Sequence, residues 1–92
     1  MDNPTLTKVL LKWDAFRKVK VWVNGKYKGV LQKREDRPIK MSKAMSLVIS
    51  RWIDQMNLSL VIALFRRMDR LEPGDVDVFF ADESNGTIHD LD

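Results

Sequence analysis

The chain has 92 residues, of which 45% are hydrophobic and 32% charged, and it contains no cysteine. This composition is that of one small globular domain, and it excludes disulfides and thiolate metal sites. Charge is unevenly spread: residues 1–40 hold eleven Lys/Arg and four Asp/Glu, residues 41–71 hold five and two, and residues 72–92 hold none and seven. The preferred explanation is that the two ends pair with each other in the fold or stay solvated, and the alternative is a nucleic-acid footprint on the basic part.

The location of the protein is predicted from its apolar runs. The longest uncharged run, Gln55 to Phe65, has eleven residues, which is about half of a membrane span. The first residues, Met1-Asp2-Asn3-Pro4, lack the positive start and apolar run of a secretory signal. We therefore expect a cytoplasmic protein that does not bind a membrane.

The first predicted element is a short amphipathic helix over residues 4–16. Asn3-Pro4 is typical of a helix start, because Asn can cap the helix and Pro fits its first turn. The spacing of the apolar residues that follow is helical: Leu6, Val9, Leu10 and Trp13.

A β-hairpin is predicted next, around Asn24-Gly25. Val19, Val21 and Val23 alternate with Lys20 and Trp22, and Asn-Gly favours a type I′ turn. A two-residue loop would pair Val23 with Lys26, Trp22 with Tyr27, Val21 with Lys28 and Val19 with Val30. One face would then carry Val19, Val21, Val23 and Val30, and the other Lys18, Lys20, Trp22, Tyr27 and Leu31.

Two helices are predicted after the charged connector from Lys33 to Lys40. The first begins at Ser42, with one apolar face formed by Met45, Val48, Ile49, Trp52, Ile53 and Met56. Asn57-Leu58-Ser59 would break it, with Ser59 capping a second helix that continues to Leu71 and ends at Pro73-Gly74. A rival interpretation makes Leu60 to Phe65 a strand.

The last predicted strand runs from Val76 to Ala81. Beyond it, Asn85-Gly86 would turn a second hairpin into Thr87-Ile88, or the end would be an acidic tail. We therefore divide the chain into an α+β domain, residues 1–81, and an acidic tail or short hairpin arm, residues 82–92. We expect this arm to screen the basic surface.

Together these elements predict an α+β fold in the order α-β-β-α-α-β, with an N-terminal β-hairpin. The alternative, if Leu60 to Phe65 is a strand, is a β-grasp-like ββαββ order. The predicted core consists of Val19, Val21, Val23, Val48, Ile49, Trp52, Ile53, Leu60, Leu64, Phe65, Val78 and Phe80.

The sequence offers little support for catalysis. Its one histidine, His89, has neither a cysteine nor a second histidine to form a metal site or a nucleophile pair. Asp82-Glu83-Ser84-Asn85-Gly86 has the wrong spacing for a calcium loop, and the glycines form no phosphate-binding loop. We expect no enzyme, no catalytic residue, no metal and no cofactor.

Two surfaces are candidates for binding. The basic and aromatic residues on and near the hairpin suit stacking on bases or contact with an acidic partner: Lys18, Lys20, Trp22, Tyr27, Lys28, Lys33 and Arg34. The other is the segment from Leu58 to Phe65, in which only Ser59 is polar, so that Leu58, Ile62 and Phe65 would lie in the core or in an interface between subunits.

The preferred hypothesis is a small protein-binding adaptor or regulator that self-associates. The alternative is a sequence-tolerant nucleic-acid-binding protein that uses the hairpin face. For Trp22 and Tyr27 we expect cover by the N-terminal helix, because no other element is predicted on that side.

Overall fold

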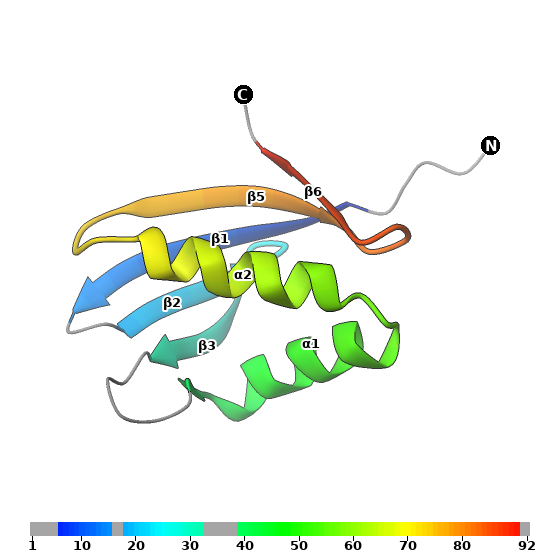
Figure 1. Ribbon diagram of the computed structural model, residues 1–92. Coiled ribbons are helices and arrows are strands. Elements are labelled where there is room, and N and C mark those ends of the chain that lie inside the picture. The colour runs from blue at the N-terminus through cyan, green and yellow to red at the C-terminus, as the bar shows by residue number, and fades with distance from the viewer. Residues whose placement is uncertain (1–5, 16–17, 33–38, 91–92) are drawn as a thin grey trace.

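A computed structural model describes residues 6–15, 18–32 and 39–90, and it contains one antiparallel sheet with two helices on one of its faces (Figure 1). The sheet has the strand order β4-β3-β2-β1-β5-β6, and every pairing is antiparallel. In chain order the elements are β1 (Leu6–Ala15), β2 (Lys18–Val23), β3 (Lys26–Gln32), β4 (Lys40–Met41), α1 (Lys43–Asp54), α2 (Leu58–Arg70), β5 (Val76–Asp82) and β6 (Thr87–Asp90).

The α+β class, the hairpin of β2 and β3, the two consecutive helices and the following strand are as predicted from the sequence. The predicted N-terminal helix is wrong, because Leu6–Ala15 forms the longest strand of the sheet. The predicted helix start at Asn3-Pro4 lies outside the described residues. The β-grasp alternative is also wrong, because Leu60 to Phe65 lies within α2.

Apolar residues on both faces of β1 explain why its sequence has helical spacing. This strand lies at the centre of the sheet, between β2 and β5. Val9 and Leu11 are fully buried under the helices, and Leu10 is half-buried on the opposite face. A strand that is apolar on both faces loses the clean alternation of a half-exposed strand, and it can mimic helical spacing.

The β2–β3 turn has the predicted conformation. Asn24 and Gly25 both have positive φ, 50° and 79°, as a type I′ turn requires. The turn is also fixed to β1, since Lys8 N–H donates to Asn24 Oδ1 and Asn24 N–H donates to the Lys8 carbonyl.

Beyond this turn the predicted register fails. Trp22 pairs with Tyr27, but a bulge then shifts β3 by one residue, so that Val21 faces Gly29 and Val19 faces Leu31. Leu31 is consequently fully buried under the helices, and Val30 lies on the opposite face, the reverse of the prediction.

Gly29 is required at the bulge because it touches the start of α1. Its φ is +119°, and an added Cβ would lie 1.8 Å from Ser42 Oγ. Ser42 caps α1: its Oγ accepts a hydrogen bond from Met45 N–H and donates one to the Lys28 carbonyl. The bulge and the cap thus set where α1 begins.

The core lies between the sheet and the helices. The buried hydrophobic residues are Val9, Leu11, Val19, Val21, Val23, Leu31, Met45, Val48, Ile49, Trp52, Leu60, Val61, Leu64, Met68, Leu71, Phe79 and Ala81. Eight predicted core residues are among them. Ile53 is instead 45% exposed, and Phe65 is half-buried against the core. The prediction that Val78 and Phe80 lie in the core is wrong, because the buried face of β5 carries Phe79 and Ala81.

The C-terminal hairpin is joined to α1 and to the turn between the helices through Glu83. Glu83 Oε1 accepts hydrogen bonds from Trp52 Nε1 (2.6 Å) and Arg51 Nη2 (2.8 Å), and Oε2 accepts one from Thr7 Oγ1 (2.6 Å). Asn57 Nδ2 donates to the Glu83 carbonyl. These contacts link β1, α1, the interhelical turn and the β5–β6 turn at one point.

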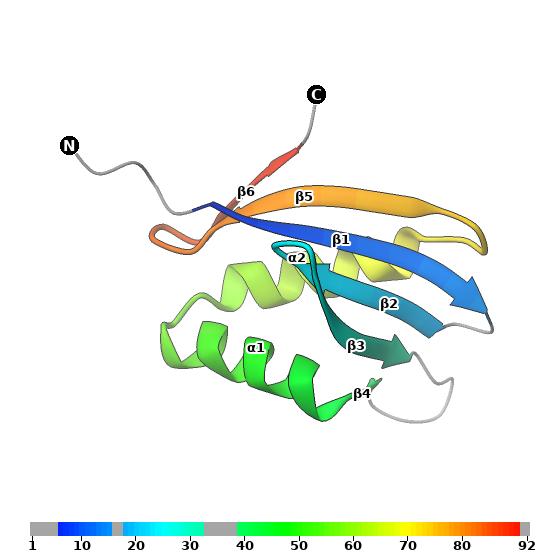
Figure 2. The same ribbon diagram turned by 180° about the vertical axis from the view of Figure 1, so that it is seen from behind.

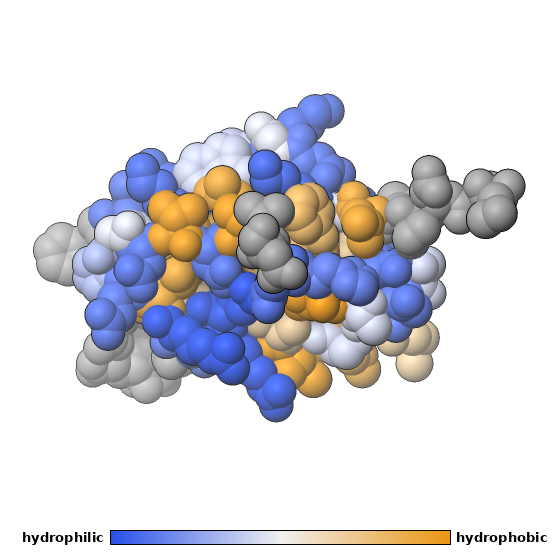
Figure 3. Space-filling view, turned by 90° about the horizontal axis from the view of Figure 1, so that it is seen from above, coloured by the Kyte–Doolittle hydropathy of each residue, from blue (hydrophilic) through white to orange (hydrophobic). Residues whose placement is uncertain are grey.

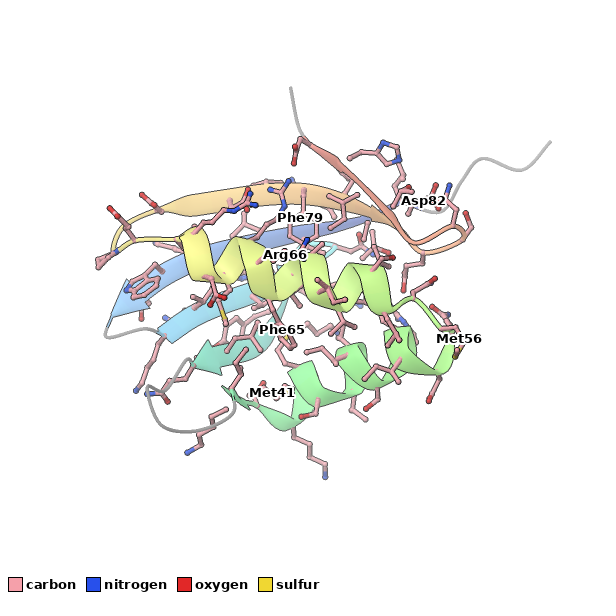
Figure 4. All side chains as sticks on the ribbon, viewed as in Figure 1. Met41, Met56, Phe65, Arg66, Phe79 and Asp82 are labelled. Carbon is pink, nitrogen blue, oxygen red and sulfur yellow. The ribbon has the colours of Figure 1, made fainter. Side chains whose placement is uncertain are left out.

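Asn57, rather than Ser59, occupies the N-cap position of α2. The Ser59 hydroxyl instead donates to the Gly86 carbonyl in the β5–β6 turn, so the predicted role of Ser59 as a cap is wrong. The preceding residue, Met56, has a φ of +60°, which turns the chain between the helices (Figure 4).

The acidic C-terminal part contacts the helices. Arg67 pairs with Asp77 (2.8 Å) and with Asp90, and its guanidinium lies 4.8 Å from the centre of the Phe79 ring. Among the described residues, the ion pairs of this acidic part are made with Arg51 and Arg67 of α1 and α2. The screening of the basic surface by residues 82–92 therefore stays a prediction.

Candidate functional site: the open face of the sheet

Within the part of the chain that the structure describes, no element lies over the face of the sheet opposite the helices. Figure 2 shows β1 and β2 passing in front of α2, with no helix in front of these strands. The predicted cover of Trp22 and Tyr27 by an N-terminal helix is wrong, because that segment is β1 and lies beside β2 within the sheet. We call this surface the open face.

Strand pairings and alternation place the side chains of the open face. It carries five lysines: Lys8, Lys12, Lys18, Lys20 and Lys40. Its larger apolar residues are Leu6, Leu10, Trp22, Tyr27, Val30, Val76, Val78 and Phe80. Its carboxylates are Asp14, which pairs with Lys20, and Asp82 at the end of β5.

The registers arrange these residues in rows that cross the strands. Val78, Leu10, Trp22 and Tyr27 are successive cross-strand partners, and we call them the apolar row. Val76, Lys12, Lys20 and Val30 form the next row, which we call the lysine row. On the other side of the apolar row, Lys8 pairs with Phe80, which in turn faces His89 on β6.

Trp22 and Tyr27 form an aromatic pair within the apolar row. Their ring centroids are 5.4 Å apart and their planes are inclined by 59°. Tyr27 is 51% exposed and Trp22 is half-buried. A tilted pair stabilises the hairpin and still leaves part of each ring accessible to a ligand.

A hollow of about 350 Å³ joins the two rows. Its lining combines an aromatic ring, aliphatic side chains and two lysines: Lys8, Leu10, Lys12, Trp22, Gly25 and Val76. A second hollow of about 230 Å³ lies between β2, β3 and β4. Its lining contains lysine, amide and hydroxyl groups as well as apolar side chains: Lys18, Val30, Gln32, Lys40, Met41 and Ser42. Both hollows offer cations beside apolar surface.

The structure brings four of the predicted binding residues together on the open face: Lys18, Lys20, Trp22 and Tyr27. Lys28 is the extra residue at the bulge and is half-buried. Lys33 and Arg34 lie outside the described residues.

Sequence reasoning missed the contribution of β1 and β5 to this surface. Lys8 and Lys12 lie on the opposite face from the buried Val9 and Leu11, but Leu10 between them makes this period of two incomplete in the sequence. Val78 and Phe80 belong to the predicted core but lie on the open face. The open face is thus wider than the predicted hairpin face.

The second predicted surface lies on α2. Leu58 and Ile62 are each 49% exposed, whereas Phe65 is half-buried and packs against the core. The helix is therefore not buried on all sides; Leu60, Val61 and Leu64 face the core. The view from above shows apolar patches separated by hydrophilic residues (Figure 3). Arg66 projects from the outer side of this helix (Figure 4).

The titratable groups near these surfaces form local hydrogen bonds. Hydrogen bonds from the Ser84 hydroxyl and N–H lower the pKa of Asp82, against partial burial, which raises it. His89 Nε2 lies 3.4 Å from Thr87 Oγ1. Within residues 6–15, 18–32 and 39–90, no three His, Asp or Glu side chains gather as a metal site requires, and neither helix is long and apolar enough to span a membrane.

No protein-family model, curated protein or solved structure matches this chain.

Proposed function

We propose that the protein is a non-enzymatic binding module and that its open face binds nucleic acid with little sequence preference. The observation that carries this proposal is the apolar row beside the lysine row on a face that no helix covers. Aromatic and aliphatic surface supports stacking of bases, and lysines attract phosphates by releasing counterions.

The composition of the face also favours nucleic acid over an ordinary protein partner. Lysine is depleted in protein interfaces relative to the rest of the surface, whereas phosphate binding uses it as a point charge. Five lysines lie on the open face. Among the described side chains of this face, Asp14 is the carboxylate that forms an ion pair with one of them, Lys20.

A polarisation assay with a labelled twelve-residue thymidine oligonucleotide tests the proposal. At about 50 mM salt we expect micromolar binding that weakens as salt is raised. The double variant Lys12→Glu/Lys20→Glu should abolish it. Lys43→Glu/Arg70→Glu, a matched double charge reversal at exposed positions on α1 and α2, should retain most of it. Absence of binding by the wild type, or equal loss in both variants, would refute the proposal.

A second candidate function is protein binding through self-association. It is supported by the exposed apolar residues of the helical side, which are Leu47, Ile53, Met56, Leu58 and Ile62. Exposed apolar surface of this kind is a common component of subunit interfaces.

Sedimentation velocity distinguishes this candidate. If the helical side forms an interface, the wild type sediments as a dimer or larger species at micromolar concentration, and Ile62→Glu gives a folded monomer, since Ile62 is half exposed. Ser50→Glu, at an exposed polar position on α1, is the control. A wild type that remains a 10.8 kDa species at high concentration argues against self-association.

A further inference from the structure

The order of the rows on the open face sets how a nucleic acid can lie on it. We infer that the ligand is a single strand that crosses the β-strands roughly at right angles, with its bases on the apolar row and its phosphates over the lysine row. This inference rests on the proposed function and specifies its ligand, orientation and footprint.

The dimensions of a sheet support this orientation. Neighbouring strands lie about 4.8 Å apart, so the four positions of the apolar row span about 14 Å. Residues two apart on one strand are separated by about 6.7 Å, which is the distance between the two rows. Bases whose faces lie against the row are not stacked on one another, so they are further apart than the spacing of about 3.4 Å in a stacked strand, and about four bases is the upper limit for this row.

The apolar row also selects single strands over duplexes. In a duplex the faces of the bases are stacked inside, so that only phosphates and groove edges reach a flat surface. A single strand can place its bases against Trp22, Tyr27 and Leu10 while its phosphates lie above Lys12 and Lys20. The hollow of about 350 Å³ beside Leu10, Lys12 and Trp22 gives a ring a recess to enter.

Asp14 has a defined role in this arrangement. Its Oδ2 lies 3.2 Å from Lys20 Nζ, and the two side chains are 48% and 40% exposed. A phosphate over the lysine row must compete with this carboxylate for Lys20. The structure thus assigns Asp14 as an intramolecular competitor, whose neutralisation strengthens binding.

The first test is a length series of thymidine oligonucleotides from two to twelve residues. Affinity should rise steeply up to about four or five nucleotides. Beyond that length it should increase only by a statistical factor, the number of positions at which a longer oligonucleotide can bind. A duplex of twelve base pairs should compete at least tenfold less well. A steep rise continuing beyond eight nucleotides, or equal competition by duplex, would overturn the inference.

The second test uses charge variants with a four-residue oligonucleotide. For two phosphate contacts, the slope of log affinity against log salt should be about −1.4, and Lys12→Gln should reduce its magnitude by about 0.7. Asp14→Asn should raise affinity about threefold or more, whereas Asp54→Asn, an exposed carboxylate on α1, should leave it unchanged.

Lower affinity of Asp14→Asn would overturn the assignment of Asp14. These outcomes are separate from failure of the proposed function, which is shown by the absence of binding to every oligonucleotide. Binding with another footprint, or without preference for single strands, overturns only the inference.

Discussion

The face of the sheet under the helices and the open face are built from alternate residues of the same strands, but they differ in chemistry. On β2, Val19, Val21 and Val23 are buried, while Lys18, Lys20 and Trp22 point to the open face. The buried residues of the helix-covered face are mainly apolar, with Phe79 among the aliphatic side chains, whereas the open face mixes apolar residues with lysines. Folding alone explains the first face. The lysines beside aromatic rings on the second face are the basis of the proposed binding function.

The largest contrast between the faces is expected for their tryptophans. Trp52 is 1% exposed, lies in the core, and donates a hydrogen bond to Glu83. Trp52→Ala should lower the free energy of unfolding by about 3–5 kcal/mol, because it leaves a large cavity. Urea denaturation measures this effect, with the exposed Leu47→Ala on the same helix as the control. A loss below about 1 kcal/mol would mean that this face is not the core.

A smaller but substantial loss of stability is expected from a substitution at the bulge in β3. Gly29→Ala should destabilise the protein by about 2–4 kcal/mol, because the backbone has positive φ and the new Cβ would collide with Ser42. Gly25→Ala is the matched control, since its φ of +79° carries strain but its Cβ would meet nothing within 4 Å; about 1 kcal/mol is expected there. Equal denaturation midpoints for the two variants would contradict the close contact.

Acid should weaken the helix-covered side through Glu83. Burial raises the pKa of this carboxyl, but hydrogen bonds from Thr7 and Trp52 and the charge of Arg51 outweigh it, so the pKa lies below its usual value. Because the folded-state pKa is lowered, the stabilisation is present above the ordinary carboxyl value and is lost as pH falls through the lower folded pKa.

Glu83→Gln should cost about 1–3 kcal/mol at pH 7 and reduce the loss of stability between pH 5 and pH 3. Urea midpoints at these pH values measure both effects. Glu72→Gln, at an exposed position, is the control. An unchanged pH profile in Glu83→Gln would show that this carboxylate does not control acid sensitivity.

The smallest stability effect is expected on the open face. Trp22→Ala should lower the free energy of unfolding by about 1 kcal/mol or less, mainly through loss of the contact with Tyr27, and it should abolish oligonucleotide binding. One denaturation curve beside that of Trp52→Ala is the measurement. Similar losses in the two variants would remove the distinction between the faces.

The hairpin, the two helices and β5 were predictable because each has a strong local signal. Asn24-Gly25 determined the turn, and Ser42 the start of α1, since both act through their immediate neighbours in sequence. The position of β1 was not predictable in this way, because its strand character depends on partners on both sides.

Which residues of β3 and β5 lie on the open face could not be predicted, because a shift of one residue in register moves a side chain to the other face and leaves no trace in the periodic pattern. The bulge at Gly29 exchanges Val30 and Leu31 between the faces, and its cause is the approach of Ser42, thirteen residues later. In β5 the run Val78-Phe79-Phe80 is apolar throughout, so the sequence did not determine which of its residues would be buried.

The pairing of β1 with β5 has a consequence for the order of folding. Leu6 pairs with Asp82, and Thr7 is hydrogen-bonded to Glu83, a separation of 76 residues. Contacts between such distant segments slow folding, commonly to milliseconds or seconds, because a long loop must close first. During synthesis, β1 and β2 emerge long before β5, and one edge of β1 is left with unpaired backbone N–H and C=O groups beside apolar side chains. Chains that stall or are cut before residue 76 should therefore aggregate, and a chaperone that covers this edge should rescue them.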